Sequence, residues 1–373
     1  MIALRSPKKV LLKSRKQLTE SEKTVFLLEK TFFQEGCSVS LSSDRIRLSD
    51  VAKRAGVSTA TASKALNNTG RMTDDTRQRV QDAAKELGFR PNAMARALIS
   101  QRSFTVGMLT NDSYGRFTMP VMEGVTEELV DDGVSVFLCS LNDDAELGQV
   151  HVRAMIDKQV DGIICAGKRI DTRLPVDLSE VSVPIVYVFT DAPGEAVSLV
   201  SDDAQGAQDA THHLLASGCK TLTHITGPES FASARERASA FGDVAGPDAP
   251  ILFGEWSENW GHKAIAQIWS GDGPKPDGIF CGNDQIARGV IDALRENGID
   301  VPQQVSVVGF DNWEIVSTAT RPPLTTVEMN LKDLGREAGR LVMEMSNGKP
   351  VEPGLRRLPC DLVIRDSCRS GVV

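Results

Sequence analysis

The sequence predicts two kinds of fold in one chain: an N-terminal all-α helix-turn-helix domain, and a longer α/β body made of two doubly wound subdomains. Three observations support this prediction. The chain has 373 residues, which is more than one ordinary hydrophobic core holds. Basic side chains concentrate before residue 104 and acidic side chains after it. Helical apolar spacing fills residues 48–88, whereas short apolar runs alternate with helical stretches from residue 104 onward.

The overall composition is typical of a globular protein and excludes several classes. Apolar residues make up 41% and charged residues 25% of the chain, and no apolar run approaches the roughly 18 residues that a membrane span needs. The basic residues near the N-terminus are followed by no apolar stretch, so we expect no secretory signal and no membrane partner. Seven scattered cysteines without a CxxC favour a reducing compartment. We therefore expect a cytoplasmic protein.

The charge is divided unevenly along the chain. Residues 1–45 carry 9 basic and 5 acidic side chains, residues 46–103 carry 11 and 5, and residues 104–373 carry 22 and 40. A basic unit ahead of an acidic body is typical of a chain whose front end meets a polyanion. Residues 1–45 match no pattern. We expect them to form a disordered basic extension, either an arm that adds phosphate contacts or an overextended start.

Residues 46–91 carry the pattern of a helix-turn-helix. The first helix is expected to end at Gly56, which permits a sharp turn with positive φ. Ser58 caps the second helix, residues 59–66, and a third helix over residues 73–87 braces the pair. The second helix turns a stripe of small and polar residues outward, so its backbone can approach the floor of a DNA major groove. Three small helices that bind only protein are the alternative.

The run from Leu48 to Asn67, LSDVAKRAGVSTATASKALN, resembles the N-terminal signature of the LacI/GalR family of bacterial repressors, and so does GFRPNAMARAL, which ends at Leu98. The resemblance implies a LacI-type domain over 46–91, a hinge helix and linker over 92–103, and an effector-binding and dimerisation domain over 104–373. Leu98 would be a wedge between base pairs in the minor groove, or else a buried residue at the dimer contact. The implied DNA-binding residues are Ser58, Thr59, Ala60, Thr61, Ser63, Lys64, Asn67, Asn92, Arg96 and Leu98.

The alternation of strands and helices after Phe104 predicts parallel sheets with helices on both faces. The resemblance implies a periplasmic-binding-protein-like arrangement, with two similar lobes, three chain crossings and a ligand cleft between the lobes. We expect the first lobe to contain residues 104–201 with 325–349, and the second to contain residues 202–324 with 350–373. A helix over 331–347 would return to the first lobe, and a last strand over 357–364 would rejoin the second.

No catalytic or metal-ligating constellation is found in the sequence, so we expect neither an enzyme nor a cofactor. The segment from Gly162 to Lys168 fits G-x-x-x-x-G-K, but its centre is an apolar strand, and Arg169 stands where a phosphate loop needs Ser or Thr. The five histidines lack metal-ligand spacing, and no serine lies in a G-x-S-x-G turn.

An effector site is expected beyond the carboxyl ends of the strands, where open α/β sheets bind ligands. A sugar needs an aromatic face and side chains that hydrogen-bond its hydroxyls. The resemblance implies stacking by an aromatic at Phe117, although Gly115-Arg116 replaces the common Asn-Pro before it. Phe189 stands where the lactose-responsive member carries a ligand carboxylate, which argues against a galactoside. The other implied contacts are a clamp at Arg237, a second stacking ring at Trp256, and polar contacts at Asn283 and Asp311.

Each of these five residues could instead lie in a surface loop or at a helix cap, with Asp284 in particular as an N-cap. Taken together, the features predict a sequence-specific, homodimeric transcription regulator that represses a carbohydrate catabolic operon. A small sugar-like effector would release it from double-stranded operator DNA. A co-repressor-dependent, purine-type regulator stays open. A sugar-binding transport protein shares the two-lobe architecture, but it would need a signal peptide and would have no helix-turn-helix.

Overall fold

The computed structural model describes residues 46–67, 69–89 and 102–369. The chain divides into two compact units, residues 1–92 and 93–373, and each is considered by itself. The expected extension over 1–45 lies outside the described residues, as does most of the expected hinge helix and linker, including Asn92, Arg96 and Leu98. Among the residues described, no helix combines the length and the apolar character that crossing a membrane requires.

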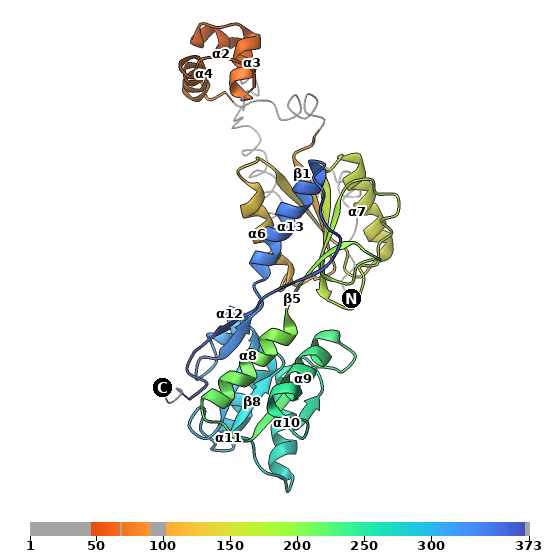
Figure 1. Cartoon of the computed structure of the whole chain (residues 1–373), viewed down its shortest axis with the longest axis vertical. Coiled ribbons are helices and arrows are strands. Elements are labelled where there is room, and N and C mark those ends of the chain that lie inside the picture. The colour runs from red at the N-terminus through yellow and green to blue at the C-terminus, as the bar shows by residue number, and fades with distance from the viewer. Residues whose placement is uncertain (1–45, 68, 90–101, 370–373) are drawn as a thin grey trace, which may run out of the picture. The chain divides into compact units, whose positions relative to one another are not determined.

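The N-terminal unit is a bundle of three short helices, α2 (Leu48–Ala55), α3 (Thr59–Leu66) and α4 (Asp74–Glu86) (Figure 1). The expected start and stop signals are confirmed. Gly56 ends α2 with φ of 68°, a conformation that glycine adopts without steric cost. The Ser58 hydroxyl accepts a hydrogen bond from the Thr61 backbone N–H at 3.1 Å. The buried core consists of small side chains, which let the helices approach closely: Val51, Ala52, Ala62, Ala65, Val80, Ala83 and Ala84.

The first lobe of the second unit is a six-stranded parallel sheet in the order β11-β5-β4-β3-β1-β2. Helices α6 (Thr118–Leu129) and α13 (Leu331–Ser346) cover one face, and α7 (Ala145–Asp157) covers the other (Figure 1). A Cβ at Gly335 would lie only 2.0 Å from the Val121 carbonyl oxygen, so glycine is required where α6 and α13 cross. The strands are β1 (Thr105–Thr110), β2 (Ser135–Ser140), β3 (Gly162–Arg169), β4 (Ile185–Thr190), β5 (Val197–Ser201) and β11 (Gly354–Leu358).

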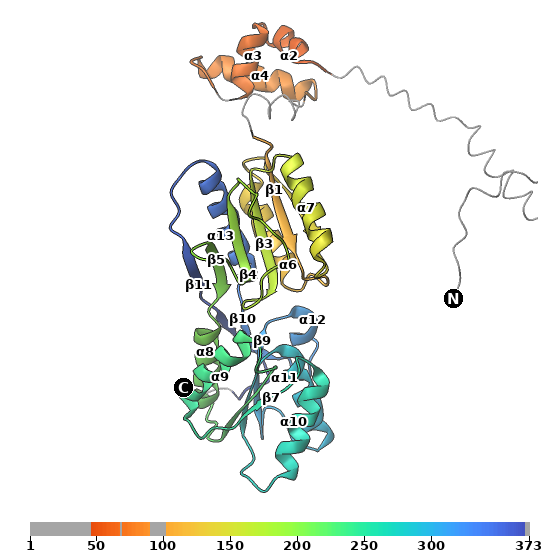
Figure 2. The same ribbon diagram turned by 90° about the vertical axis from the view of Figure 1, so that its right-hand side faces the viewer.

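The second lobe is also a six-stranded sheet, in the order β12-β10-β9-β8-β6-β7, and its edge strand β12 is antiparallel. Figure 2 shows this lobe with β7, β9 and β10 labelled. Residues alternate along β8: Phe280 packs with the α8 and α9 residues, whereas Ile279 packs with α10 and α11. The strands are β6 (Leu222–Thr226), β7 (Ile251–Phe253), β8 (Gly278–Cys281), β9 (Ser306–Asp311), β10 (Thr325–Glu328) and β12 (Asp361–Val363). The helices are α8 (Asp203–Ala216), α9 (Ala232–Ala245), α10 (Glu258–Ser270), α11 (Asp284–Glu296) and α12 (Glu314–Ser317).

The expected division of the chain between the lobes is wrong at two strands. Residues 325–328, expected in the first lobe, form β10 and pair in parallel with β9 of the second sheet. Residues 354–358, expected in the second lobe, form β11 and pair with β5 of the first sheet. The single strand expected over 357–364 is therefore two strands in different sheets. Apolar alternation marks a segment as a strand, but it does not indicate which sheet edge the strand joins.

Candidate functional site

The outward face of α3 is the candidate DNA-contacting surface. Thr59, Ala60, Lys64 and Asn67 are exposed and Ser63 is half-buried, as the helical spacing predicts. Ser58 and Thr61 have a further role, because the Ser58 hydroxyl bonds both the backbone N–H and the hydroxyl of Thr61. These two residues start the helix in addition to lying near its exposed end.

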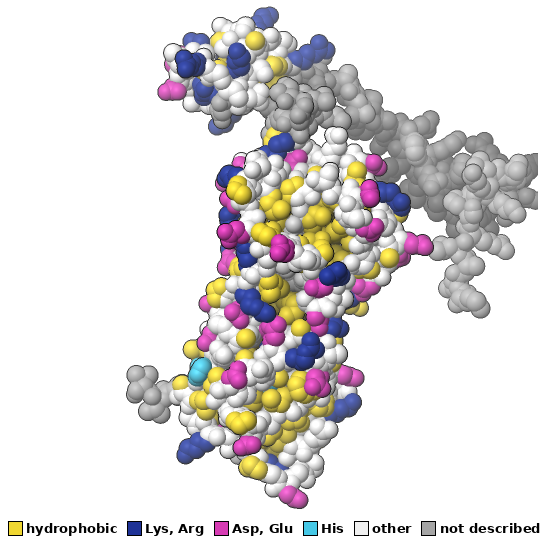
Figure 3. Space-filling view, turned by 45° about the vertical axis from the view of Figure 1, so that its right-hand side comes forward, with side chains coloured by type: hydrophobic (Ala, Val, Ile, Leu, Met, Phe, Trp, Pro, Cys, Tyr) yellow, Lys and Arg dark blue, Asp and Glu magenta, His cyan; other side chains and the backbone are white. Residues whose placement is uncertain are grey.

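Several cationic side chains are visible on the face of the three-helix unit that Figure 3 shows. Arg54 of α2 forms an ion pair with Glu86 of α4 at 2.8 Å, which links the first helix to the bracing helix. Lys64 forms no ion pair with any residue that the structure describes. A Cβ added at Gly70 would lie 3.0 Å from the Lys64 Cδ, so the lysine stem passes close to this glycine. The Lys64 ammonium is therefore positioned on the exposed face of α3 without a carboxylate partner among those residues.

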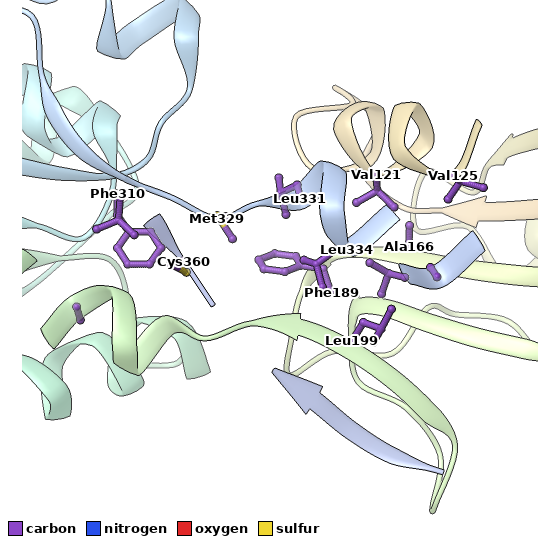
Figure 4. Close-up of a cluster of buried hydrophobic side chains, with 14 of the residues drawn as sticks. Val121, Val125, Ala166, Phe189, Leu199, Phe310, Met329, Leu331, Leu334 and Cys360 are labelled. Atoms are coloured by element: carbon purple, nitrogen blue, oxygen red, sulfur yellow. The ribbon is translucent and has the colours of Figure 1, made fainter. Parts of the chain in front are cut away.

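Apolar side chains form a continuous cluster where the chain crosses between the lobes (Figure 4). Met329 lies between Phe310 of the second lobe and Leu331 of the first, and Phe189 lies beside Leu331 (Figure 4). All four of these side chains are buried. The segment that connects β10 to α13 is therefore packed against both lobes.

Arg237, the expected clamp, lies on α9 and is almost completely buried. Its guanidinium donates to Asp203 Oδ1 at 2.7 and 3.1 Å and to the Gly282 carbonyl oxygen at 2.5 Å. The guanidinium carbon lies 3.5 Å from the centroid of the Phe310 ring. Two carboxylates surround this cation, because Asp311 Oδ1 lies 3.8 Å from Nη1. Arg237 is thus held rigidly, with its hydrogen bonds made to the second lobe itself.

Asp311 lies at the carboxyl end of β9 with φ of 103°, a strained value for a residue with a side chain. Its carboxylate forms an ion pair with Arg116, which comes from the first lobe. Burial raises the pKa of Asp311 above its usual range, and the guanidinium groups of Arg116 and Arg237 oppose this shift. Such strain and such a desolvated charge are common at functional positions.

The helix-cap alternative holds for Asn283 but not for Asp284. The N-cap of α11 is Asn283, whose side chain accepts from the Ile286 backbone N–H at 2.8 Å. Asp284 is fully buried and accepts from the Thr326 hydroxyl at 2.5 Å and from the Trp313 backbone N–H at 2.7 Å. Burial, and then the charge of Asp311, raise the pKa of Asp284 well above its usual range. The Asn283 side-chain oxygen therefore caps α11. The Asp284 carboxylate links β10, through Thr326, to the loop after β9, through Trp313.

The two expected aromatic residues lie on different lobes. Phe117 precedes α6, and its ring stacks on that of Phe189 at a centroid distance of 4.9 Å. Trp256 of the second lobe packs edge-on against Phe231 at 5.9 Å, and its ring lies 5.9 Å from the Arg237 guanidinium carbon. The sequence-predicted residues thus contribute from both lobes, and Arg237 contacts both Trp256 and Asp311.

A pocket of about 270 Å³ also opens between the lobes, but none of the five expected effector residues lines it. The first lobe contributes Thr190, Asp191 and Ser198, and the second contributes Ala232 and Glu236. Arg357 of β11 closes one side through an ion pair with Glu236 at 2.9 Å. No group of three or more His, Cys, Asp or Glu side chains arranged for a metal ion is found among the described residues.

Three residues of the interlobe region were not predicted as site residues. Asp203 follows β5, a strand that the apolar pattern of the sequence did not predict, and its burial beside Arg237 is visible only in the fold. Trp313 follows β9, and the Arg116 guanidinium carbon lies 4.7 Å from the centroid of its ring. In the sequence, Arg116 stands out only as a departure from the family pattern. That departure is the one available signal, because Gly115-Arg116 brings a charge to a position next to an expected ligand contact where the family pattern has an uncharged pair.

Comparisons with known proteins agree with this architecture. Residues 47–92 match the family described as bacterial regulatory proteins, lacI family, and residues 211–368 match the periplasmic binding protein-like domain. The HTH-type transcriptional repressor PurR of Aliivibrio fischeri (strain MJ11) is 30% identical over 331 residues, which cover 86% of this chain and 97% of that protein.

Two solved structures match most of the chain in fold. The lac repressor dimer bound to operator and the anti-inducer ONPF has a TM-score of 0.67 at 26% identity, covering 87% of this chain and 99% of that one. The CelR–cellobiose complex has a TM-score of 0.60 at 25% identity, covering 87% of this chain and 100% of that one. The fold, the identity and the extent of these matches agree. The chain therefore belongs to the LacI family of bacterial regulatory proteins, and it is a DNA-binding transcriptional regulator and not an enzyme.

Proposed function

We propose that this regulator is a homodimeric repressor of a carbohydrate catabolic operon, and that a small sugar-like effector binding between the lobes releases it from operator DNA. The observation that carries the proposal is that guanidinium groups and aromatic rings from both lobes meet buried carboxylates of the second lobe. Carboxylate and guanidinium groups hydrogen-bond hydroxyl pairs, and aromatic rings pack on the C–H faces of sugars.

Besides the apolar cluster at the chain crossings, polar groups of the two lobes contact each other, and a ligand that binds between the lobes can change their relative angle. Asp171 of the first lobe accepts from the Ala232 backbone N–H at 2.8 Å, and Arg169 donates to the Ser230 carbonyl at 3.1 Å. A ligand that binds the conformation with one angle between the lobes more tightly shifts the population toward that conformation. In a dimer, such a shift would separate the paired DNA-binding units and lower operator affinity.

The DNA-binding part of the proposal rests on the exposed face of α3. Two such helices in a dimer would enter major grooves about one helical turn apart on a pseudo-palindromic site. The structural relatives support a dimer and a sugar effector, since one is a lac repressor dimer bound to operator and another is a CelR–cellobiose complex.

The test is fluorescence anisotropy of the full chain against DNA fragments from its own genome, followed by a panel of sugars and purines. We expect one fragment to bind at least 1,000-fold more tightly than random DNA and one sugar to lower that affinity. A purine that raises operator affinity would instead support the co-repressor alternative. If no genomic fragment is preferred over random DNA, the proposed function is wrong.

A further inference from the structure

Arg116 is a cation from the first lobe whose partners lie in the second. It stands in the loop between β1 and α6, and its guanidinium forms an ion pair with Asp311 and donates to Gln285 Oε1 at 3.1 Å. The Arg116 side chain is 16% exposed and that of Asp311 is 8% exposed. The pair is therefore a desolvated contact that joins the lobes.

The surroundings of this guanidinium are those of a binding site and not of a surface ion pair. Its carbon lies 4.7 Å from the centroid of the Trp313 ring and 5.3 Å from that of Phe117, so aromatic rings from both lobes flank it. The Arg116 Nε is buried and has no hydrogen-bond partner among the described residues. A buried N–H without an acceptor is uncommon, and it marks a position where another acceptor would be stabilised.

The two guanidinium groups near Asp311, those of Arg116 and Arg237, differ in how far they depend on it. Arg237 keeps its bonds to Asp203 and to the Gly282 carbonyl whether or not Asp311 is engaged elsewhere. Arg116, in contrast, has Asp311 as its carboxylate partner among the described residues. A neutral sugar whose hydroxyls bonded Asp311 and displaced Arg116 would leave a partly buried guanidinium without an anion, which is costly. A ligand that carries its own anion would avoid that cost.

We propose that Arg116 selects the effector, which is a polyhydroxylated small molecule bearing a carboxylate or a phosphate. The ligand's anionic group would replace the Asp311 carboxylate at the Arg116 guanidinium, and its hydroxyls would donate to the freed Asp311. Arginine suits this role because its planar guanidinium binds carboxylate and phosphate oxygens in pairs. The inference rests on the proposed function, since it assumes a sugar-like effector between the lobes.

The experiment uses the full chain and sets of matched sugars: glucose with glucuronate and glucose 6-phosphate, galactose with galacturonate, and fructose with fructose 6-phosphate. Calorimetry measures affinity, and anisotropy measures release of operator DNA. We expect one anionic member to bind at least 10-fold more tightly than its neutral counterpart, and the carboxylate and phosphate arms identify which anion it is. Arg116→Gln should abolish that preference, and Arg116→Lys, which keeps the charge, should retain part of it.

Arg295→Gln is the matched control, because Arg295 is an exposed arginine of the second lobe paired with Asp292. It should leave the preference unchanged. A neutral sugar that binds and releases DNA as well as its anionic counterparts would refute the role of Arg116 and leave the proposed function intact. An anionic preference that survives in Arg116→Gln would also refute it. If no sugar of either kind binds, the sugar-like effector and the inference resting on it are both wrong.

Discussion

Replacing Arg237 by Met tests whether the buried cation holds the second lobe together. The Arg237 side chain is 4% exposed and that of its partner Asp203 is 1% exposed. Methionine fills a similar volume without charge, so the change leaves the Asp203 carboxylate buried and unpaired. Removing one partner of a buried pair costs about 3–5 kcal/mol, and the lost bond to Gly282 adds about 1 kcal/mol. We expect the second lobe to lose at least about 3 kcal/mol of unfolding free energy.

The assay is urea unfolding followed by tryptophan fluorescence. The chain has four tryptophans, and all of them, Trp256, Trp260, Trp269 and Trp313, belong to the second lobe, so the signal reports that lobe. The double variant Arg237→Met with Asp203→Asn removes both charges and should recover at least about 1 kcal/mol of the loss. Arg295→Met, at an exposed site, should stay within about 0.5 kcal/mol of the wild type.

Two results would refute this reasoning. One is a loss below about 1 kcal/mol in Arg237→Met, which would mean that the carboxylate finds solvent or a proton easily. Burial raises the pKa of Asp203, so protonation is the route by which the cost could be reduced. The other is a double variant that is no more stable than Arg237→Met alone, which would place the loss in packing and not in charge.

Four further predictions concern other parts of the chain. Lys64→Ala should weaken operator binding by about 1–3 kcal/mol if Lys64 contacts a base edge, and an equal loss on random DNA in anisotropy titrations would show a phosphate contact only. Thr73→Ala removes the acceptor for the Thr76 N–H at 3.3 Å and should destabilise the three-helix unit by about 1 kcal/mol. Amide hydrogen exchange in α4 should become faster, whereas the urea transition seen by tryptophan fluorescence, which reports the second lobe, should not change. Gly335→Ala should cost about 1–3 kcal/mol in thermal unfolding because its Cβ would overlap the α6 backbone, whereas Gly242→Ala, which has open space within α9, should be neutral or stabilising. The folded-state pKa of Asp284 is raised, so the wild type should lose stability as pH rises from 4 to 8 and the carboxyl group ionises. Asp284→Asn lacks this ionisation, so its melting temperature should rise relative to that of the wild type over the same range. A melting-temperature difference that does not change with pH would contradict the assignment.

The amino-acid sequence by itself determined the three-helix unit almost completely. The cap at Ser58, the left-handed turn at Gly56 and the apolar spacing of Val51, Ala62 and Val80 all act within about thirty residues. Such local signals specify where a helix begins, where it ends and which side is buried. The same local signals predict the alternation of strands and helices in the two lobes, whereas Arg237 and Asp311 were expected to share one site only through the family resemblance.

The tertiary structure alone decided which distant residues became partners. Periodicity shows that residues 325–328 form a strand, but only the pairing of β10 with β9 places them in the second lobe. Arg116 and Asp311 are 195 positions apart, and no local pattern indicates that one will neutralise the other. A buried charge needs an opposite charge nearby in space, and the chain crossings between the lobes determine which one it meets. The groups that could discriminate an effector were therefore visible in the sequence as residue types, and their electrostatic relationship was visible only in the fold.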